Sequence, residues 1–488
     1  MLWIMIHLIA AALLSLSATA AEWPQFRGPN GMGIGQASKL PVQFGPAQNV
    51  AWKTELPHGH SSPVIWGDRI FLTAAEGGTR TQLAPGRVID EGGKLYTICI
   101  DRLTGKILWK REAPRPRLEK YQPTNSAASP SPVTDGKTVY VFFGDFGVIA
   151  YALDGTERWK LPLGPFNNPN GHGSSPVLVD NLLVLLCDQD TNSYLMAIDK
   201  ETGRVAWKTE RPDVTRSYST PGILRPKRGP VELIIAGSYQ LASYSAETGE
   251  KLWWITGLSW QPKSLPIIDG DIIYVHWWEN GGEAEQPTET PTWGETLARF
   301  DANEDKKISR DEFSSDPRLQ RGFGDNDLAG DGFVDERDWE FYRSRRSARN
   351  ALLAVRHGAR GDLTGSSSIL WRMQKYLPNT PSPLLYNNVL YLIKDGGILT
   401  SIDPKSGEIL KQGRLPEALD TYYASPVGGA GLIYVVSHHG KITVLKAGAE
   451  WEILATNDFA EESFSTPAII NDSLYVRTRT ALYSFKAE

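Results

Sequence analysis

Oxygen-bearing side chains recur at fixed spacing in residues 301–312, the stretch of this 488-residue chain with the clearest chemistry. Side-chain oxygens stand at positions 1, 3, 5, 9 and 12 of this segment, and position 7 offers a backbone carbonyl: Asp301, Asn303, Asp305, Ser309, Glu312 and Lys307. Calcium takes about six to eight oxygen ligands and accepts them at this spacing. The segment therefore predicts a calcium loop, and the alternative is a solvated acidic loop.

The spacing is that of an EF-hand, with helical residues 294–300 before the loop. Its one departure is Lys306 at position 6, where glycine normally permits a sharp turn. A lysine with positive φ costs about 1 kcal/mol, which weakens the predicted site without removing a ligand.

A second loop of the same length follows at residues 327–338. Its candidate ligands are Asp327, Asp331, the carbonyl of Phe333, Asp335 and Asp338. Gly332 and Val334 fit the turn and apolar positions, but Ala329 replaces a ligand and Asp338 replaces the longer glutamate. This loop either binds metal or pairs with the first loop as structural support.

A helix expected over residues 339–350 carries four arginines, Arg343, Arg345, Arg346 and Arg349. Such a run is typical of a solvated helix face, and the alternative is that it neutralises the carboxylates of the two loops.

The rest of the chain is organised by recurring Ser-Pro or Thr-Pro pairs, with Leu265-Pro266 as a variant. Their prolines are Pro63, Pro132, Pro176, Pro221, Pro266, Pro383, Pro426 and Pro467. Five of the seven gaps between them lie at 41–45 residues, the length of one four-stranded propeller blade. Each unit leaves a sheet face uncovered, so stacking around a ring is required to bury it. The pattern predicts an all-β, eight-bladed propeller.

Each repeat also carries a glycine turn followed by a strand with tryptophan, as in Asp101–Gly105 with Trp109. The last repeat has three short strands before the chain ends, while residues 49–56 carry the same Trp-Lys signature. We expect this N-terminal strand to close the ring, because closure removes both open sheet edges.

The repeated Asp-x-x-Thr-Gly-x-x-x-Trp signature resembles the PQQ-like, quinoprotein-type propeller repeat over most of residues 22–488. That group includes alcohol dehydrogenases that use pyrroloquinoline quinone (PQQ) and the assembly lipoprotein BamB. The opening Trp23–Gly31 also resembles the start of exported members that are not dehydrogenases. The resemblance implies the fold, whereas function is set by sites built on it.

Two gaps between successive repeat prolines are longer than one blade, which indicates two insertions in the ring. Residues 279–350 interrupt blade five, dividing the propeller into 22–278 and 351–488, and residues 76–93 interrupt blade one. Both insertions join the second strand of a blade to the third. Because strands alternate in direction, these loops share a face with the connections between blades, which line the channel mouth. We place function on this face and expect the two insertions on opposite sides of the channel.

Residues 1–21 resemble an export signal, with an apolar run and an Ala18–Ala20 cleavage site. We expect a periplasmic or secreted protein without a membrane span or lipid anchor, since no cysteine stands near the cleavage site. The net charge of −5 disfavours nucleic acid as a partner. Cys99 and Cys187 lie in apolar runs of different repeats and are expected to be buried free thiols.

Quinoprotein dehydrogenases place their cofactor over a tryptophan floor beneath a disulfide of adjacent cysteines, and this chain has no adjacent pair. Trp260, Trp277 and Trp278 could form such a floor, although packing is favoured. His60 and His172 precede Ser-Pro pairs and are expected to occupy matching positions of the repeat, which favours repeat symmetry over catalysis. We therefore expect a non-catalytic scaffold that binds calcium and presents a protein- or ligand-binding face, without PQQ. The alternative is a PQQ-dependent oxidoreductase.

Overall fold

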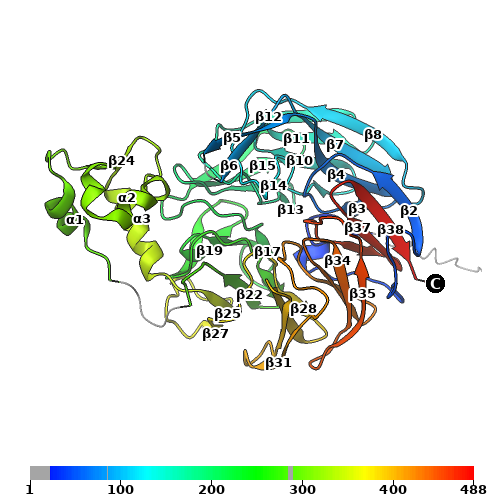
Figure 1. Cartoon of the computed structure of the whole chain (residues 1–488). Helices are drawn as coiled ribbons and strands as arrows, with labels where there is room; N and C mark the ends of the chain where they lie inside the picture. Colours follow the sequence, from blue (N-terminus) through cyan, green and yellow to red (C-terminus); the bar gives the residue numbers. More distant parts are fainter. Residues whose placement is uncertain (1–21, 85, 284–288, 488) are drawn as a thin grey trace, which may run out of the picture.

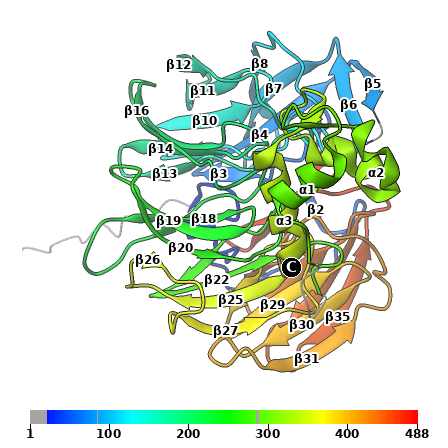
Figure 2. The ribbon, with the colours of Figure 1, turned by 90° about the vertical axis from the view of Figure 1, so that its left-hand side faces the viewer.

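The computed structural model describes residues 22–84, 86–283 and 289–487. The export signal predicted at residues 1–21 lies outside these ranges. The described residues form eight four-stranded antiparallel units arranged in a ring (Figure 1). A small helical unit projects from one side of the ring, and in the turned view it lies in front of the ring (Figure 2). Among these residues no helix is both long and apolar enough to cross a membrane.

The first four blades follow one another along the chain. Blade one contains β3 (Val64–Trp66), β4 (Arg69–Glu76), β7 (Lys94–Asp101) and β8 (Ile107–Ala113), with β1 (Glu22–Trp23) at its inner edge. Blade two contains β9 (Val133–Thr134), β10 (Thr138–Phe143), β11 (Gly147–Ala152) and β12 (Glu157–Pro162). Blade three contains β13 (Val177–Val179), β14 (Leu182–Cys187), β15 (Tyr194–Asp199) and β16 (Val205–Glu210). Blade four contains β17 (Gly222–Leu224), β18 (Glu232–Gly237), β19 (Gln240–Ser245) and β20 (Lys251–Thr256).

The second half of the ring includes the interrupted blade. Blade five contains β21 (Ile267–Asp269), β22 (Ile272–Trp277), β25 (Ala351–Arg356) and β27 (Ile369–Met373), and its β26 (Gly361–Asp362) adds to blade four. Blade six contains β28 (Leu384–Tyr386), β29 (Val389–Lys394), β30 (Ile398–Ile402) and β31 (Ile409–Arg414). Blade seven contains β32 (Val427–Gly429), β33 (Leu432–Val436), β34 (Lys441–Lys446) and β35 (Glu452–Asp458). Blade eight contains β36 (Ala468–Ile470), β37 (Ser473–Arg477), β38 (Ala481–Lys486) and the N-terminal β2 (Val50–Glu55).

The ring is closed by pairing between the two ends of the chain. Strand β2 runs antiparallel to β38, with Val50 opposite Phe485 and Glu55 opposite Ala481. This pairing gives the last blade its fourth strand and covers the outer edge of β38, which would otherwise be unpaired.

The Ser/Thr-Pro repeat is explained by a circle of hydrogen bonds around the channel. In seven of the blade junctions, the backbone N–H of the residue before proline donates to a hydroxyl at the same position in the next blade, at 2.9–3.0 Å. The accepting hydroxyls belong to Ser131, Ser175, Thr220, Ser382, Ser425, Thr466 and Ser62. Leu265 donates in this circle but has no hydroxyl with which to accept.

The glycine-turn and tryptophan signature is explained by contacts between neighbouring blades. The Trp52 indole N–H of blade eight donates to the Arg102 carbonyl of blade one at 2.9 Å. Its ring also lies so close to Gly105 that a Cβ there would be 2.7 Å from it. The same arrangement joins four further pairs of blades, with Trp109, Trp159, Trp207 and Trp371 against Gly155, Gly203, Gly249 and Gly407.

The insertion in blade five forms a compact unit with its own core, and it is hereafter called the module. It contains α1 (Trp293–Phe300), β23 (Ile308–Ser309), η2 (Glu312–Ser315), α2 (Pro317–Asn326), β24 (Phe333–Val334) and α3 (Glu336–Ser347). Strands β23 and β24 pair antiparallel, which joins the two acidic loops back to back. Phe300, Phe313, Phe323 and Trp339 are buried beneath them.

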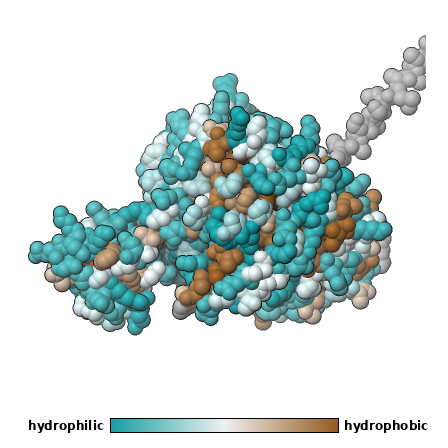
Figure 3. Space-filling view, turned by 90° about the horizontal axis from the view of Figure 1, so that it is seen from above, coloured by the Kyte–Doolittle hydropathy of each residue, from teal (hydrophilic) through white to brown (hydrophobic). Residues whose placement is uncertain are grey.

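The helix predicted at residues 339–350 is α3, which begins and ends three residues earlier. It begins earlier because the Asp335 carboxylate accepts a hydrogen bond from the Asp338 N–H and caps the helix. The insertion in blade one is a hairpin of β5 (Thr79–Ala84) and β6 (Arg87–Glu91). Viewed from above, the molecule is mostly hydrophilic with separate apolar patches, and the module projects from its side (Figure 3).

Candidate functional site

A pocket of about 580 Å³ occupies the channel mouth on the face that carries the connections between blades. Each of the eight connections contributes at least one side chain to its wall. They include His60, Asn125, Asn170, Tyr218, Lys263, Asn379, Tyr423 and Phe464, in order around the ring. The structure thus places the pocket on the face that the strand directions indicated.

The N-terminal segment lies against the inner strands of several blades and contributes Phe26 to the pocket. Trp23 pairs with β3 of blade one, while Gly35 donates to the Gly428 carbonyl of blade seven. The Pro24 carbonyl accepts from Thr134 of blade two, and the Arg27 side chain reaches carbonyls at the entry to blade six, so the segment crosses the channel; Phe26 is the residue through which it reaches the pocket. The Trp23–Gly31 stretch noted in the sequence has this structural role.

Arg27 holds the segment in place. Its guanidinium is completely buried and donates to four backbone carbonyls, those of Gly31, Met32, Ser382 and Pro383. Two of these carbonyls belong to the segment itself and two belong to the connection that leads into blade six. One side chain therefore ties the N-terminal segment to the ring.

The charged groups in the pocket wall are Lys263, Glu279 and Arg345. The Arg345 Nε donates to a Glu279 oxygen at 2.6 Å, so these two charges neutralise each other. The Lys263 ammonium donates to the Gln261 carbonyl and to Asn379 Oδ1, both at 3.0 Å. Burial lowers the pKa of Lys263 to about 8, against a smaller opposing effect of Glu279.

Aromatic side chains form two parts of the wall. Trp260 and Trp278 lie on one side, whereas Tyr423 and Phe464 stack on each other with ring centroids 5.2 Å apart. The guanidinium groups of Arg216 and Arg345 lie 4.5 Å and 3.8 Å from the centroid of Trp260. Trp277 is buried in the blade core and donates to the Gly237 carbonyl, so it is a packing residue.

The two histidines singled out in the sequence occupy different environments. His60 stacks on Phe464 at 3.9 Å and lines the pocket, while His172 packs beneath the wall against Phe142 and Phe166. They are not equivalent by repeat, since His60 stands three residues before its proline and His172 stands four. Burial lowers the pKa of both, that of His172 to about 4, so both are neutral at pH 7.

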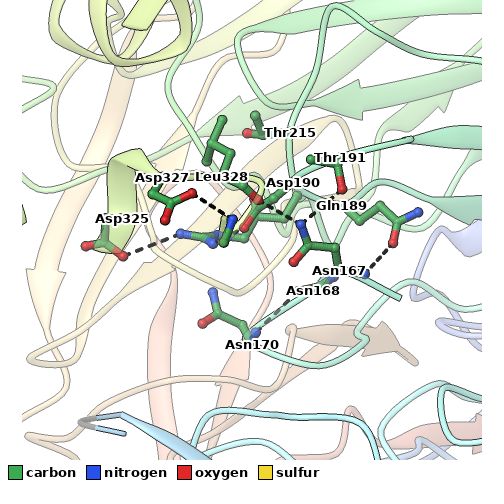
Figure 4. Close-up of polar contacts among 12 residues, drawn as sticks. Asn167, Asn168, Asn170, Gln189, Asp190, Thr191, Thr215, Asp325, Asp327 and Leu328 are labelled. Atoms are coloured by element: carbon green, nitrogen blue, oxygen red, sulfur yellow. Dashed lines mark hydrogen bonds and ion pairs between the residues drawn. The ribbon is translucent and has the colours of Figure 1, made fainter. Parts of the chain in front are cut away.

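The module docks on blades three and four rather than rising straight from blade five (Figure 4). The Asn167 amide donates to the Leu328 carbonyl at 2.7 Å, and Arg337 donates to the Asp190 carbonyl at 2.8 Å. Phe341 stacks on Tyr239 with ring centroids 5.7 Å apart. The expectation of two insertions on opposite sides of the channel is therefore modified, because the module leans over the neighbouring blades.

The sequence predicted that the arginines of this helix form one solvated face. The arginines of α3 do not form such a face. Arg343 pairs with Glu340 on the helix surface, at 2.8 Å. Arg345 instead points to the pocket, where it contacts Glu279 and Trp260. A side chain of the module thus forms part of the channel-mouth wall.

The first acidic loop is wound around Asp301. Its carboxylate accepts from the N–H groups of Asp305 and Lys306, at 3.2 Å and 3.0 Å. Lys306 has φ 62°, the left-handed conformation that glycine would provide at position 6. Lys306 therefore adopts the strained left-handed backbone conformation that its position in the loop predicted. Glu312 reaches back across the loop to accept from Ala302 and Ser309.

The second loop has the same backbone conformation. Gly330 and Gly332 have positive φ at positions 4 and 6, as Glu304 and Lys306 do in the first loop. Asp327 accepts from the N–H groups of Gly330, Asp331 and Gly332. The Asp338 side chain is buried, and burial together with nearby Asp335 raises its pKa to about 7.

The first loop fits a hard cation better than the second. Its candidate ligands are carboxylate, amide, hydroxyl and carbonyl oxygens, the donor set that calcium prefers. The second loop lacks an oxygen at Ala329, and its Asp335 is engaged as the cap of α3. Within the described ranges, no group of three or more His, Cys, Asp or Glu side chains converges as a preformed metal site.

The two cysteines are separate. Cys99 lies in blade one and Cys187 in blade three, and both are free and buried. Burial raises the pKa of each thiol to about 12, so both are protonated and unreactive at neutral pH.

Comparison with known proteins assigns the chain to a family. The family described as "Outer membrane protein assembly factor BamB" matches residues 47–186, 86–286 and 338–488. The chain belongs to this family. The matches leave out residues 287–337, which include most of the module.

Solved structures share the fold. The structure of BamB from Moraxella catarrhalis is 10% identical, with 90% of this chain and 98% of that chain covered and a TM-score of 0.52. A quinohemoprotein alcohol dehydrogenase from Pseudomonas putida HK5 is 12% identical, with 95% and 80% covered and a TM-score of 0.50. At these identities the likeness concerns fold alone. No curated protein matches the chain in sequence.

Sequence reasoning located the face and the two loops but missed the residues that make the pocket distinctive. Lys263 precedes the Leu265-Pro266 variant pair by two residues, so its place in a connection between blades was a usable signal. Phe26 and Arg345 gave no such signal, because they reach the pocket from the N-terminal segment and from the module.

Proposed function

We propose that this protein is an exported, non-catalytic propeller scaffold. Its module binds calcium, and its channel mouth presents a binding face for a protein or ligand in the periplasm or outside the cell. The family description, an outer membrane protein assembly factor, supports a role in binding other envelope proteins.

The observation that carries the proposal is the attachment of the module to the channel mouth. Its second loop contacts blade three through Leu328, and α3 brings Arg345 into the pocket wall. We therefore expect ordering of the two paired loops to act on the residues that face the pocket through these contacts. The calcium loop and the binding face form one structure.

Asp301, Asn303, Asp305, Ser309, Glu312 and the Lys307 carbonyl would hold the ion in the first loop. Calcium would supply positive charge to a loop whose carboxylates accept mainly backbone N–H groups. Exposed EF-hands of extracellular modules bind calcium with dissociation constants of about 10⁻⁴–10⁻³ M. At such an affinity, external calcium serves as a constant brace for the module.

Calorimetric titration with calcium tests this proposal on the full mature protein. We expect uptake by the wild type and a sharp loss of affinity in Glu312→Gln, which removes the carboxylate at position 12. Glu304→Gln is the matched control, because Glu304 is exposed at position 4 and is not among the proposed ligands. Equal uptake by wild type and Glu312→Gln would show that the ligands are wrong. No uptake by the wild type would refute calcium binding.

A further inference from the structure

We infer that the channel-mouth pocket binds a small acidic sugar, of the uronic acid class, with Lys263 holding its carboxylate. This inference rests on the binding face of the proposed function and names the chemistry of its ligand. It is argued from the shape of the pocket, its charge and the groups in its wall.

The pocket has the size and form of a small-molecule site. Its volume of about 580 Å³ lies within the range of about 300–1,000 Å³ common to ligand pockets. The N-terminal segment crosses the channel and places Phe26 in the pocket wall, where Arg27 and its four carbonyl partners fix the backbone. A small ligand entering from the mouth therefore meets a firm wall on the channel side.

The charge in the wall favours one negative group on the ligand. Glu279 and Arg345 neutralise each other, which leaves Lys263 as an excess positive charge among the described wall residues. The Lys263 ammonium has three N–H donors, and the described partners Gln261 and Asn379 accept two of them. One donor therefore remains for a carboxylate.

The other wall groups favour a ligand with many hydroxyls. Amide side chains, which both donate and accept, are contributed by Gln122, Asn125, Asn170, Gln261, Asn280 and Asn379. Sugar hydroxyls can donate to the oxygens of these amides and accept from their N–H groups.

Aromatic side chains complete the match, because the apolar C–H face of a sugar ring packs against them. Trp278 and Tyr218 supply such surfaces on one side of the pocket, and Tyr423 supplies one on the other. An aromatic polycarboxylate would also stack here, but it would bring more negative charge than the single excess positive charge balances. The wall therefore favours a monocarboxylate sugar.

The test is a titration of the calcium-loaded full mature protein at pH 7 with D-glucuronate, D-glucose and PQQ, followed by tryptophan fluorescence and calorimetry. We expect glucuronate to bind at least tenfold more tightly than either of the other two. Lys263→Met should weaken glucuronate binding at least tenfold. Lys405→Met, which removes an exposed lysine from a turn of blade six, should leave it unchanged.

A pH series on the wild type gives a second readout that needs no variant. Lys263 is charged below a pKa of about 8 and neutral above it, so glucuronate affinity should fall as the pH rises through about 8. An exposed lysine would hold its charge to about pH 10. Of the charged and titratable groups that face Lys263, Glu279 and Arg345 form an ion pair with each other, and burial lowers the pKa of His276 to about 3, so His276 stays neutral across this pH range.

Absence of glucuronate binding, equal binding of glucose, tighter binding of PQQ, or wild-type affinity in Lys263→Met would each overturn the inference. So would affinity that stays constant between pH 7 and pH 9. Calcium uptake is measured separately through Glu312→Gln. Failure of the sugar titration with calcium binding intact would thus refute the ligand alone and leave the calcium proposal standing.

Discussion

Replacing Gly105 by alanine tests whether the glycine-turn and tryptophan signature holds neighbouring blades together. Gly105 has φ +75°, and a Cβ at this position would lie 2.7 Å from the Trp52 ring of the adjacent blade. We expect two separate penalties, one from backbone strain and one from overlap with the indole. The overlap also displaces the ring from its hydrogen bond to the Arg102 carbonyl.

A matched control separates the free-energy cost of backbone strain from the cost of overlap with the indole. Left-handed strain for alanine costs about 1 kcal/mol, whereas overpacking against a fixed ring costs about 1–3 kcal/mol. Gly67 has φ +56° and open space around its Cβ position, so Gly67→Ala carries the strain alone. We expect a loss of unfolding free energy of about 2–4 kcal/mol for Gly105→Ala and about 1 kcal/mol for Gly67→Ala.

The assay is unfolding in urea. The urea concentrations at the unfolding midpoint are compared between variants that have equal m-values, the slope of the unfolding free energy against urea concentration. A double variant adds the decisive measurement, because a Trp52→Ala background removes the overlap with the indole, so Gly105→Ala should then cost only the strain and the remaining contact with Thr54 Oγ1, which lies 2.9 Å from the Cβ position. The coupling between the two positions should be about 1–3 kcal/mol. Equal destabilisation by Gly105→Ala and Gly67→Ala, or a coupling near zero, would refute this account of the signature.

Two further predictions concern ring closure and catalysis. Deleting residues 49–56 should strongly lower the thermal unfolding temperature, because it leaves the outer edge of β38 unpaired; an almost unchanged temperature would contradict closure by β2. Adding PQQ and calcium should not produce dye reduction with a panel of alcohols and sugars, since Cys99 and Cys187 lie apart and cannot form a disulfide of adjacent residues. Robust turnover would favour the dehydrogenase alternative.

The two loops show how far sequence reasoning reaches into the site. The candidate ligands and their spacing could be predicted because the loop is a local structure, and the strain at Lys306 followed from its position alone. The docking of the module could not be predicted from the sequence, because Asn167 and Leu328 meet only after the ring has brought blade three beneath the insertion. The place of Arg345 in the pocket wall could not be predicted for the same reason.

The sequence by itself determined the ring. Each Ser/Thr-Pro pair contacts the equivalent pair one blade away, and each signature tryptophan contacts the glycine turn of the next blade. Contacts between neighbouring blades therefore recur in the sequence at the length of one blade. The tertiary structure alone decided the pocket. Phe26, Lys263 and Arg345 are distant in sequence and share no pattern. They meet because closure of the ring, the crossing N-terminal segment and the leaning module converge on the same channel mouth.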